Sequence, residues 1–278
     1  MRRRPTRSGG AFRLAGRRNC ASTGAMTQRP AVLVTGGARR IGAAIVRGFG
    51  NAGWHVMIHY GDSGGAAQAL ADELPSAETV QCDLAEDSAA LQMIEDLAAR
   101  LADWRVLVNC AGVFEPDDAN ALDAGINLRA MAVNARVPAL MAQRFLARAS
   151  AHGGRRVIDV TDQKLANPNP DFFSYTMSKH ALAGVAQMLT KARRDPRDRI
   201  YNLAPGAILP SHDQTEAETE VSHRLNLLKR KTQAKEVADA ALFLASGWLA
   251  SGQTLFVDSG QHLMDQSRDV IYLAREGR

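Results

Sequence analysis

A phenol and an ammonium group stand four residues apart in the chain, at Tyr175 and Lys179. Residues at this spacing share one face of a helix, so the two side chains would be neighbours. A tyrosine with an ordinary pKa near 10 is a poor proton donor or acceptor at neutral pH, and a nearby cation favours its phenolate. The pair therefore predicts a proton-transfer group, with Lys179 lowering the pKa of Tyr175.

A glycine-containing turn follows the first apolar run and leads into a stretch of helical length. The turn reads Thr35-Gly36-Gly37-Ala38-Arg39-Arg40-Ile41-Gly42. Glycine lets the backbone turn tightly and approach a pyrophosphate group, which then sits over the N-terminus of the following helix. Its position between a strand and a helix favours a dinucleotide-binding turn over an ordinary strand–helix connection.

Short apolar runs alternate with longer segments of helical length from residue 31 onward. The runs are 31–35, 55–60, 105–110, 155–161, 199–204 and 254–258. The helical segments are 41–52, 64–74, 87–102, 120–150 with a break, 174–194 and 235–246. Continuous apolar runs are typical of strands buried on both faces, and intervening helices make crossover connections. We therefore predict an α/β fold: a single-domain, Rossmann-like, doubly wound parallel sheet of about seven strands with helices on both faces.

The domain is predicted to span residues 29–265. Residues 1–28 would be an N-terminal extension, either disordered or upstream of a true start at Met26, and 266–278 a C-terminal tail. Within the domain, 207–233 is polar and weakly helical, which is typical of a mobile lobe over a binding site.

The net charge of +5 belongs mostly to the extension. Residues 1–25 contain seven arginines and no acidic residue, and the rest of the chain has 27 basic and 29 acidic residues. The body of the protein is therefore not basic, and we predict no nucleic-acid partner. Because no run approaches the roughly 18 consecutive apolar residues of a membrane span, we also predict no membrane partner.

The three cysteines, at positions 20, 82 and 110, have no paired spacing. They are predicted to be free thiols in a reducing compartment. The N-terminal extension lacks the apolar core of a secretion signal. We therefore expect a cytoplasmic protein.

The histidines show no metal-binding pattern. His55 and His59 would be too far apart along a strand to share one metal ion. Three others, His212, His223 and His262, lie in polar stretches without ligand partners in the sequence. We predict no metal site.

The chain resembles the short-chain dehydrogenase/reductase family over roughly residues 30–263. The family's turn is TGxxxGxG, and Thr35, Gly36 and Gly42 match it, whereas Arg40 replaces the middle glycine. This variant resembles the branch of pteridine reductases and dihydromonapterin reductases. An arginine there adds a cation beside the pyrophosphate and can reach a planar, polar substrate.

Further matches follow in the family's order and imply a set of cofactor contacts. Cys82-Asp83-Leu84 is similar to the segment that contacts the adenine ring, and Pro205-Gly206 to the motif that flanks the nicotinamide. Asn109-Cys110-Ala111-Gly112 resembles the NNAG segment. The cofactor-binding residues implied are Thr35, Gly36, Arg39, Arg40, Ile41, Gly42, Tyr60, Ser63, Asp83, Leu84, Asn109, Ala111, Gly112, Lys179, Pro205 and Gly206.

The resemblance implies a catalytic set of Asp162, Tyr175, Lys179 and Asn134. Asp162 occupies the place of the family serine, thirteen residues before the tyrosine, as in the pteridine reductases. A carboxyl group can pass a proton toward a ring nitrogen, whereas a hydroxyl group mainly orients a carbonyl. Thr161 remains an alternative as a displaced serine. Asn134 resembles the helix asparagine that holds a water leading to Lys179.

The implied substrate is small and flat. Phe114 is similar to the phenylalanine that sandwiches a pterin against the nicotinamide, since stacking suits an aromatic heterocycle. The substrate-binding residues implied are Arg40, Phe114, Asp162 and Tyr175. We expect a reductase of dihydropteridines, of the dihydromonapterin or dihydrofolate type. A reductase of ketones or 3-oxoacyl thioesters is the alternative, and a non-catalytic cofactor sensor is a remote one.

The end of the second strand favours NADP(H), with NAD(H) possible. Tyr60 occupies the position of the acidic residue that binds the ribose of NAD. Arg39 and Ser63 suit a 2′-phosphate, whereas Asp62 would repel it. The resemblance further implies a homotetramer, or a dimer, assembled through the helices near 120–150 and 174–194.

Overall fold

The computed structural model describes residues 29–211 and 213–276. Within these residues the strands form one parallel sheet in the order β3-β2-β1-β4-β5-β6-β7. The strands are β1 (Ala31–Val34), β2 (His55–Tyr60), β3 (Ala77–Gln81), β4 (Trp104–Asn109), β5 (Arg156–Val160), β6 (Arg199–Pro205) and β7 (Thr254–Val257). The predicted doubly wound sheet is confirmed.

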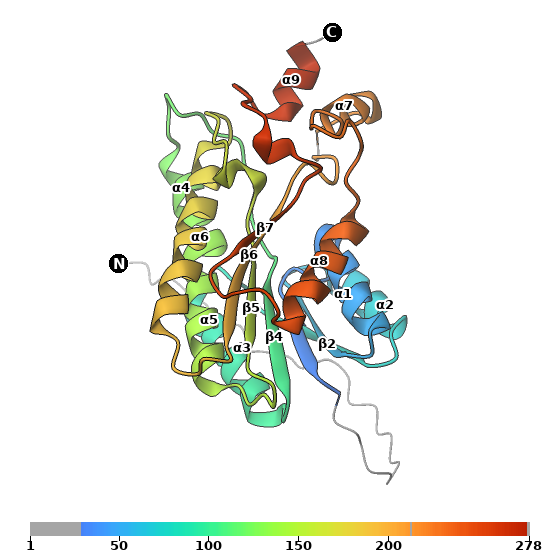
Figure 1. The fold of residues 1–278 in the computed structure, drawn as a ribbon, viewed down its shortest axis with the longest axis vertical. Coiled ribbons are helices and arrows are strands. Elements are labelled where there is room, and N and C mark those ends of the chain that lie inside the picture. Colours follow the sequence, from blue (N-terminus) through green and yellow to red (C-terminus); the bar gives the residue numbers. More distant parts are fainter. Residues whose placement is uncertain (1–28, 212, 277–278) are drawn as a thin grey trace, which may run out of the picture.

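Helices cover both faces of this sheet (Figure 1). They are α1 (Arg40–Asn51), α2 (Gly64–Asp72), α3 (Asp87–Arg100), α4 (Ala124–Met131), α5 (Val137–Arg148), α6 (Phe173–Ala192), α7 (Glu216–Ser222), α8 (Ala234–Ser246) and α9 (Val270–Glu276). Alternate residues of each central strand face opposite ways, so the apolar core divides into two clusters. One cluster packs the sheet against α1, α2 and α8, and the other against α3, α5 and α6.

The predicted break within 120–150 is a π-helical turn. This turn, Ala132–Arg136, joins α4 to α5 and contains the fully buried Asn134. Such π-turns widen a helix locally and often occur at functional sites. The break therefore lies where it can aim the Asn134 amide out of an otherwise regular helix.

The carboxyl-terminal ends of the strands form the binding edge of the sheet. β1 lies between β2 and β4, so the chain reverses its winding direction there. A crevice at the carboxyl ends beside such a reversal is the usual ligand site of open α/β sheets. In Figure 1, α7 and α9 lie together above this edge, and Arg275 of α9 bonds to Glu218 of α7.

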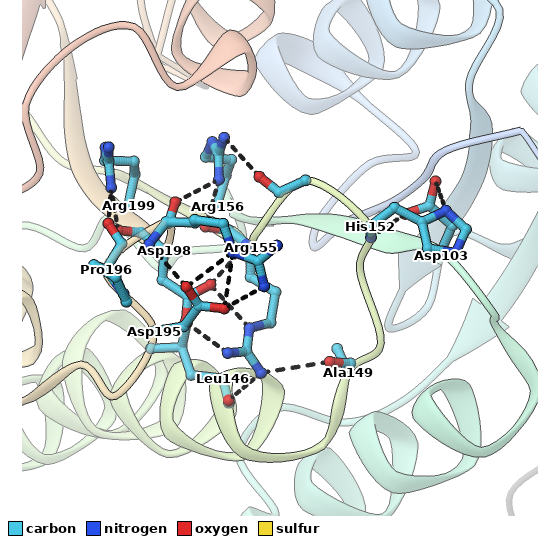
Figure 2. Close-up of polar contacts among 12 residues, drawn as sticks. Asp103, Leu146, Ala149, His152, Arg155, Arg156, Asp195, Pro196, Asp198 and Arg199 are labelled. Carbon is cyan, nitrogen blue, oxygen red and sulfur yellow. Dashed lines mark hydrogen bonds and ion pairs between the residues drawn. The ribbon is translucent and has the colours of Figure 1, made fainter.

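At the amino-terminal ends of the strands, opposite the binding edge, an ion pair connects two loops. Arg155, in the loop before β5, makes a two-pronged contact to Asp198, with Nε–Oδ1 and Nη2–Oδ2 distances of 3.0 and 2.7 Å. Figure 2 shows that the same guanidinium also reaches the carbonyl oxygen of Leu146, at the end of α5. Paired, planar contacts of this kind fix loop geometry. They join the α5–β5 and α6–β6 loops far from the binding edge.

The predicted extension 1–28 lies outside the described residues. None of the helices in the described part of the chain is both long and apolar enough to cross a membrane. Residues 270–276, assigned to a tail from the sequence, form α9.

Candidate functional site

The turn after β1 has the glycine requirement expected of a phosphate-binding loop. Gly36 has a φ of +62°, and a Cβ there would lie 2.9 Å from the Cα of Ala111. A Cβ at Gly42 would lie 2.2 Å from the carbonyl oxygen of Gly36. The turn therefore folds back onto the first turn of α1, with Ile41 at the cavity, and places backbone N–H groups at a helix N-terminus where a pyrophosphate binds.

Two buried side chains hold this turn in place. The Thr35 hydroxyl accepts hydrogen bonds from the backbone N–H groups of Cys110 and Ala111, at 2.9 and 3.1 Å. His59 accepts from Gly36 N through Nδ1 at 3.1 Å, and its Nε2 lies 3.0 Å from the carbonyl oxygen of Cys82. Burial lowers the pKa of His59 to about 4, so the ring is neutral and Nε2 carries the donated proton.

His59 was considered from the sequence only as a metal ligand. No local pattern marked it as a support of the turn, because the three segments that it joins are distant in sequence. In the described ranges, His, Cys, Asp and Glu side chains do not gather into groups of three or more able to hold a metal ion.

Tyr175 and Asp162 are directly bonded at the binding edge. The phenol donates a 2.8 Å hydrogen bond to Oδ2 of Asp162, and the backbone N–H of Lys164 donates to Oδ1 at 2.8 Å. Lys179, one turn further along α6, donates from Nζ to the carbonyl oxygen of Val160 at 2.7 Å. Its ammonium lies 5.5 Å from the centre of the Tyr175 ring. The shared helix face predicted from the spacing is thus present.

In this arrangement the pKa of Tyr175 is raised, not lowered as the spacing predicts. Burial, followed by the Asp162 carboxylate, raises the pKa of Tyr175 well above its ordinary value near 10. Burial also raises the pKa of Asp162 and lowers that of Lys179. The site therefore holds a neutral phenol beside a carboxyl group that retains its proton more readily than an exposed aspartate.

Asn134 and Thr161 take positions beneath this pair. Asn134 accepts from Val113 N at 2.8 Å and donates to Val113 O and Ser178 Oγ. Its predicted water remains a prediction. The Thr161 hydroxyl donates to the carbonyl oxygen of Leu203 inside the sheet, so it does not take the place of the family serine.

A cavity of about 470 Å³ opens over Asp162 and Tyr175. Its walls come from the β1–α1 turn, the loops after β4, β5 and β6, α7, and the start of α9. The lining includes Arg40, Ile41, Gly112, Phe114, Asp162, Lys164, Tyr175, Pro205, Gly206, Gln214, His223, Gln261, Asp269, Val270 and Ile271. Predicted substrate and nicotinamide contacts thus share one cavity.

Aromatic rings form one side of the cavity. The Phe114 ring stands edge-on to Tyr175, with centroids 4.7 Å apart, and stacks on Phe172 at 4.1 Å. Phe172 in turn stacks on Tyr272 of α9 at 6.0 Å. The C-terminal helix is therefore part of the site, which the sequence prediction of a tail missed.

Arg40 connects the turn to the 207–233 lobe. Its φ of +55° starts α1 in a left-handed conformation, and its guanidinium donates to the carbonyl oxygens of Pro210 and Leu209. The side chain lies at the cavity, where it can meet both a phosphate and a flat substrate. Gly206 is also required, since a Cβ there would lie 2.6 Å from Gln261 Oε1.

The remaining predicted cofactor residues divide into two groups. Three of them end or begin an element: Tyr60 is the last residue of β2, and the exposed Arg39 and the half-buried Ser63 precede α1 and α2. Asp83 caps its own loop by accepting from Ala85 N at 2.9 Å.

Two others are built into the core. Leu84 is 6% exposed and packs in the cluster under α3. Asn109 is 1% exposed and bonds to Asp159 within the sheet. The Asn109 side chain thus holds strands together, and is not among the residues that line the cavity.

Comparison with known proteins shows the same fold over most of the chain. The protein family described as enoyl-(acyl carrier protein) reductase matches residues 36–262. The dihydromonapterin reductase of Escherichia coli (strain K12) is 25% identical over 240 residues, which cover 85% of this chain and 98% of that protein.

Two solved structures extend the likeness. The FolM alternative dihydrofolate reductase 1 from Brucella canis, complexed with NADP, is 33% identical with a TM-score of 0.80, covering 88% of this chain and 98% of that one. An angucycline C-6 ketoreductase, LanV, with bound NADP is 28% identical with a TM-score of 0.77, covering 84% and 96%. Reductases of pterins and of ketones therefore share this architecture.

Proposed function

The chain belongs to the short-chain dehydrogenase/reductase family, and we propose that it is an NADPH-dependent reductase of a small, flat dihydropteridine, of the dihydromonapterin or dihydrofolate type. The hydrogen bond between Tyr175 and Asp162 carries this proposal. It places a carboxyl group where a ketone reductase of this family has a hydroxyl. A carboxyl group that retains its proton can protonate a ring nitrogen.

The residues of the turn fit a nicotinamide dinucleotide phosphate. Gly36 and Gly42 leave a cradle that a Cβ would fill, and Tyr60 leaves the end of β2 without the acidic residue that would bind the ribose of NAD. Arg39 and Ser63 would hold the 2′-phosphate, and Lys179 the nicotinamide ribose. When bound, the reduced nicotinamide supplies the hydride. The NADP in two related structures agrees with this choice.

The remaining chemistry would come from the chain itself. Phe114 would lie against the flat ring of the substrate, and Arg40 would hold its polar edge. Asp162 would deliver the proton, and Tyr175 would hold the carboxyl group in place through their hydrogen bond. Lys179 would provide a positive charge beneath the Asp162–Tyr175 pair, and the buried Asn134 would keep the neighbouring backbone ordered through its hydrogen bonds.

The proposal is tested with purified protein, NADPH and a set of dihydropteridines, following loss of NADPH absorbance. We expect turnover of at least one dihydropteridine and a marked preference for NADPH over NADH. NADPH oxidation with ketones and none above background with any pterin would overturn the substrate assignment while leaving the family unchanged.

Reduction of a ketone is the second candidate, favoured by the similarity to the LanV ketoreductase. The variant Asp162→Ser separates the two. If the physiological substrate is a ketone, a serine that orients the carbonyl should maintain or raise activity. If it is a dihydropteridine, loss of the carboxyl group should lower activity strongly.

We also propose that the chain assembles into homotetramers, or dimers, through α4, α5 and α6. An apolar groove of about 290 Å³ runs between these helices, lined by residues that include Leu128, Met131 and Val185. Leu128 and Met188 are 67% and 63% exposed, which is costly for isolated apolar side chains gathered on one face. Light scattering of Leu128→Arg against the wild type tests it: the variant should have a lower molar mass.

A further inference from the structure

The lobe wall of the cavity carries a histidine whose ring makes no hydrogen bond to any residue that the structure describes. His223 directly follows α7, is 4% exposed, and belongs to the cavity lining. Throughout residues 29–211 and 213–276 its ring nitrogens have no hydrogen-bond partner. They are also absent from the polar atoms sealed inside the protein without one. The ring therefore meets the cavity.

The polar neighbours of His223 on this wall are hydrogen-bonded to one another. Gln214 Oε1 accepts from Ser211 N at 2.9 Å, and Gln214 Nε2 donates to Ser222 Oγ at 3.2 Å. The Ser222 hydroxyl in turn donates to the carbonyl oxygen of Thr219. This network fixes the orientation of the Gln214 amide, whereas both nitrogens of the imidazole are open to a ligand.

The charge state of the ring is set by its surroundings. Burial, with a contribution from Lys231, lowers the pKa of His223. A neutral imidazole has one donor and one acceptor. Because the ring nitrogens reach the cavity, a ligand group with a matching donor or acceptor can bond to the imidazole in place of water.

The helix that precedes His223, α7, is bonded to the C-terminal helix. Arg275 of α9 reaches Glu218 Oε1 from Nε at 3.3 Å and Asp213 Oδ2 from Nη2 at 3.0 Å. Glu218 and Thr215 also form a capping box at the start of α7. Because α7 is held in place by these bonds, the imidazole that follows it is preorganised to recognise a ligand.

We propose that His223 is a specificity-determining residue, which hydrogen-bonds through its neutral imidazole to a hydroxyl-bearing side chain of the substrate. Asp162, Tyr175 and Phe114 would hold the reacting ring, whereas His223 would read its substituent from the lobe wall. A hydroxyl group matches the imidazole because both donate and accept a hydrogen bond. The choice of a pteridine as the ring rests on the proposed function, whereas the role of His223 does not.

The test compares His223→Leu, His223→Gln and wild type on two dihydropterins, one with a trihydroxypropyl side chain and one with a methyl group. We expect His223→Leu to lower kcat/KM about 10- to 100-fold for the hydroxylated substrate, mainly through KM, and to change the methylated one little. His223→Gln, which keeps a donor and an acceptor, should recover part of the loss. His152→Leu, on the exposed far edge of the sheet, serves as the matched control and should behave as wild type.

Equal losses for both substrates, or no change in KM, would overturn the role of His223, provided that the variants keep the thermal midpoint of the wild type. If wild type reduces no dihydropterin, the proposed function fails independently. The same comparison is then made on a flat hydroxylated ketone and its unhydroxylated analogue, where the same outcomes decide the role of His223.

Discussion

Asn109 on β4 and Asp159 on β5 are joined by a 2.7 Å hydrogen bond from Asn109 Nδ2 to Asp159 Oδ1, across two central strands. Asp159 is fully buried, and in the described part of the chain its other carboxylate oxygen has no partner. Burial raises the pKa of Asp159 to about 7. The folded protein therefore retains a proton that an unfolded aspartate loses at lower pH.

The first prediction is that Asp159→Asn changes the pH dependence of stability. Because the folded pKa of Asp159 lies above the ordinary aspartate value near 3.8, its contribution to stability falls as pH rises toward and through 7. Relative to wild type, the variant should gain about 2 kcal/mol between about pH 5 and pH 8. Urea unfolding at both pH values measures this. Asp96→Asn, at an exposed position on α3, is the control, and a pH-independent difference for Asp159→Asn would contradict the interpretation.

The second prediction concerns His59, whose contribution to stability changes with pH in the opposite direction to that of Asp159. The folded pKa of His59, about 4, lies below the ordinary histidine value near 6.5, so stability is lost as pH falls from 6.5 toward 4. Between about pH 7 and pH 5 this group alone should remove about 2 kcal/mol. In His59→Gln that component disappears, and the free energy of unfolding should change less over the same range.

The same variant tests the support that His59 gives to Gly36. We expect weaker binding of NADPH by His59→Gln, measured by fluorescence titration, even at neutral pH where the wild-type ring carries no charge. The exposed His152→Gln should match wild type in both measurements. Unchanged NADPH affinity in His59→Gln would show that the turn does not depend on this hydrogen bond.

The limits of sequence-based prediction are visible in these residues. Apolar runs and the glycine turn are local patterns, and they identified the strand–helix alternation and the shared helix face of Tyr175 and Lys179. The hydrogen bonds of His59 and Asp159 join segments separated by more than 20 residues. Tertiary packing determines these hydrogen bonds, so no local spacing of residues in the sequence predicts them.

The pKa of Tyr175 was predicted in the wrong direction for the same reason. The spacing reveals Lys179 as a neighbour, but burial and the Asp162 carboxylate outweigh it. The place of α9 was missed because a short C-terminal helix has no pattern that shows where it packs. Arg275 of α9 bonds to α7, and the two residues just before the helix, Arg268 and Asp269, pair with Asp171 and Lys164. All of these contacts depend on the assembled fold.

A third prediction concerns Asp162 as proton donor. Asp162→Asn keeps the shape of the side chain but cannot deliver the proton. We expect kcat for the dihydropteridine to fall about 100- to 1,000-fold with little change in KM. Since burial raises the pKa of Asp162, wild-type kcat should decline as pH rises through that value. Measured over a range of pH, kcat should show this decline in wild type and not in Asp162→Asn. An identical decline in both proteins would assign the proton to another group.

The fourth prediction concerns the ion pair between Lys164 and Asp269, whose Nζ–Oδ2 distance is 2.7 Å. The two side chains are 4% and 9% exposed, so Asp269→Asn leaves a buried ammonium without its counter-charge. Breaking such a pair costs about 3 kcal/mol or more, whereas replacing both partners with apolar residues is often neutral. Asp269→Asn should therefore lower the urea midpoint clearly, and the double variant Lys164→Met with Asp269→Leu should recover much of the lost stability.

Because Val270 and Ile271 line the cavity directly after Asp269, the single variant Asp269→Asn should also raise KM. Asp239→Asn, which breaks an exposed pair with Lys235, should change stability by less than about 1 kcal/mol; an equally small effect for Asp269→Asn would show that the pair does not anchor α9.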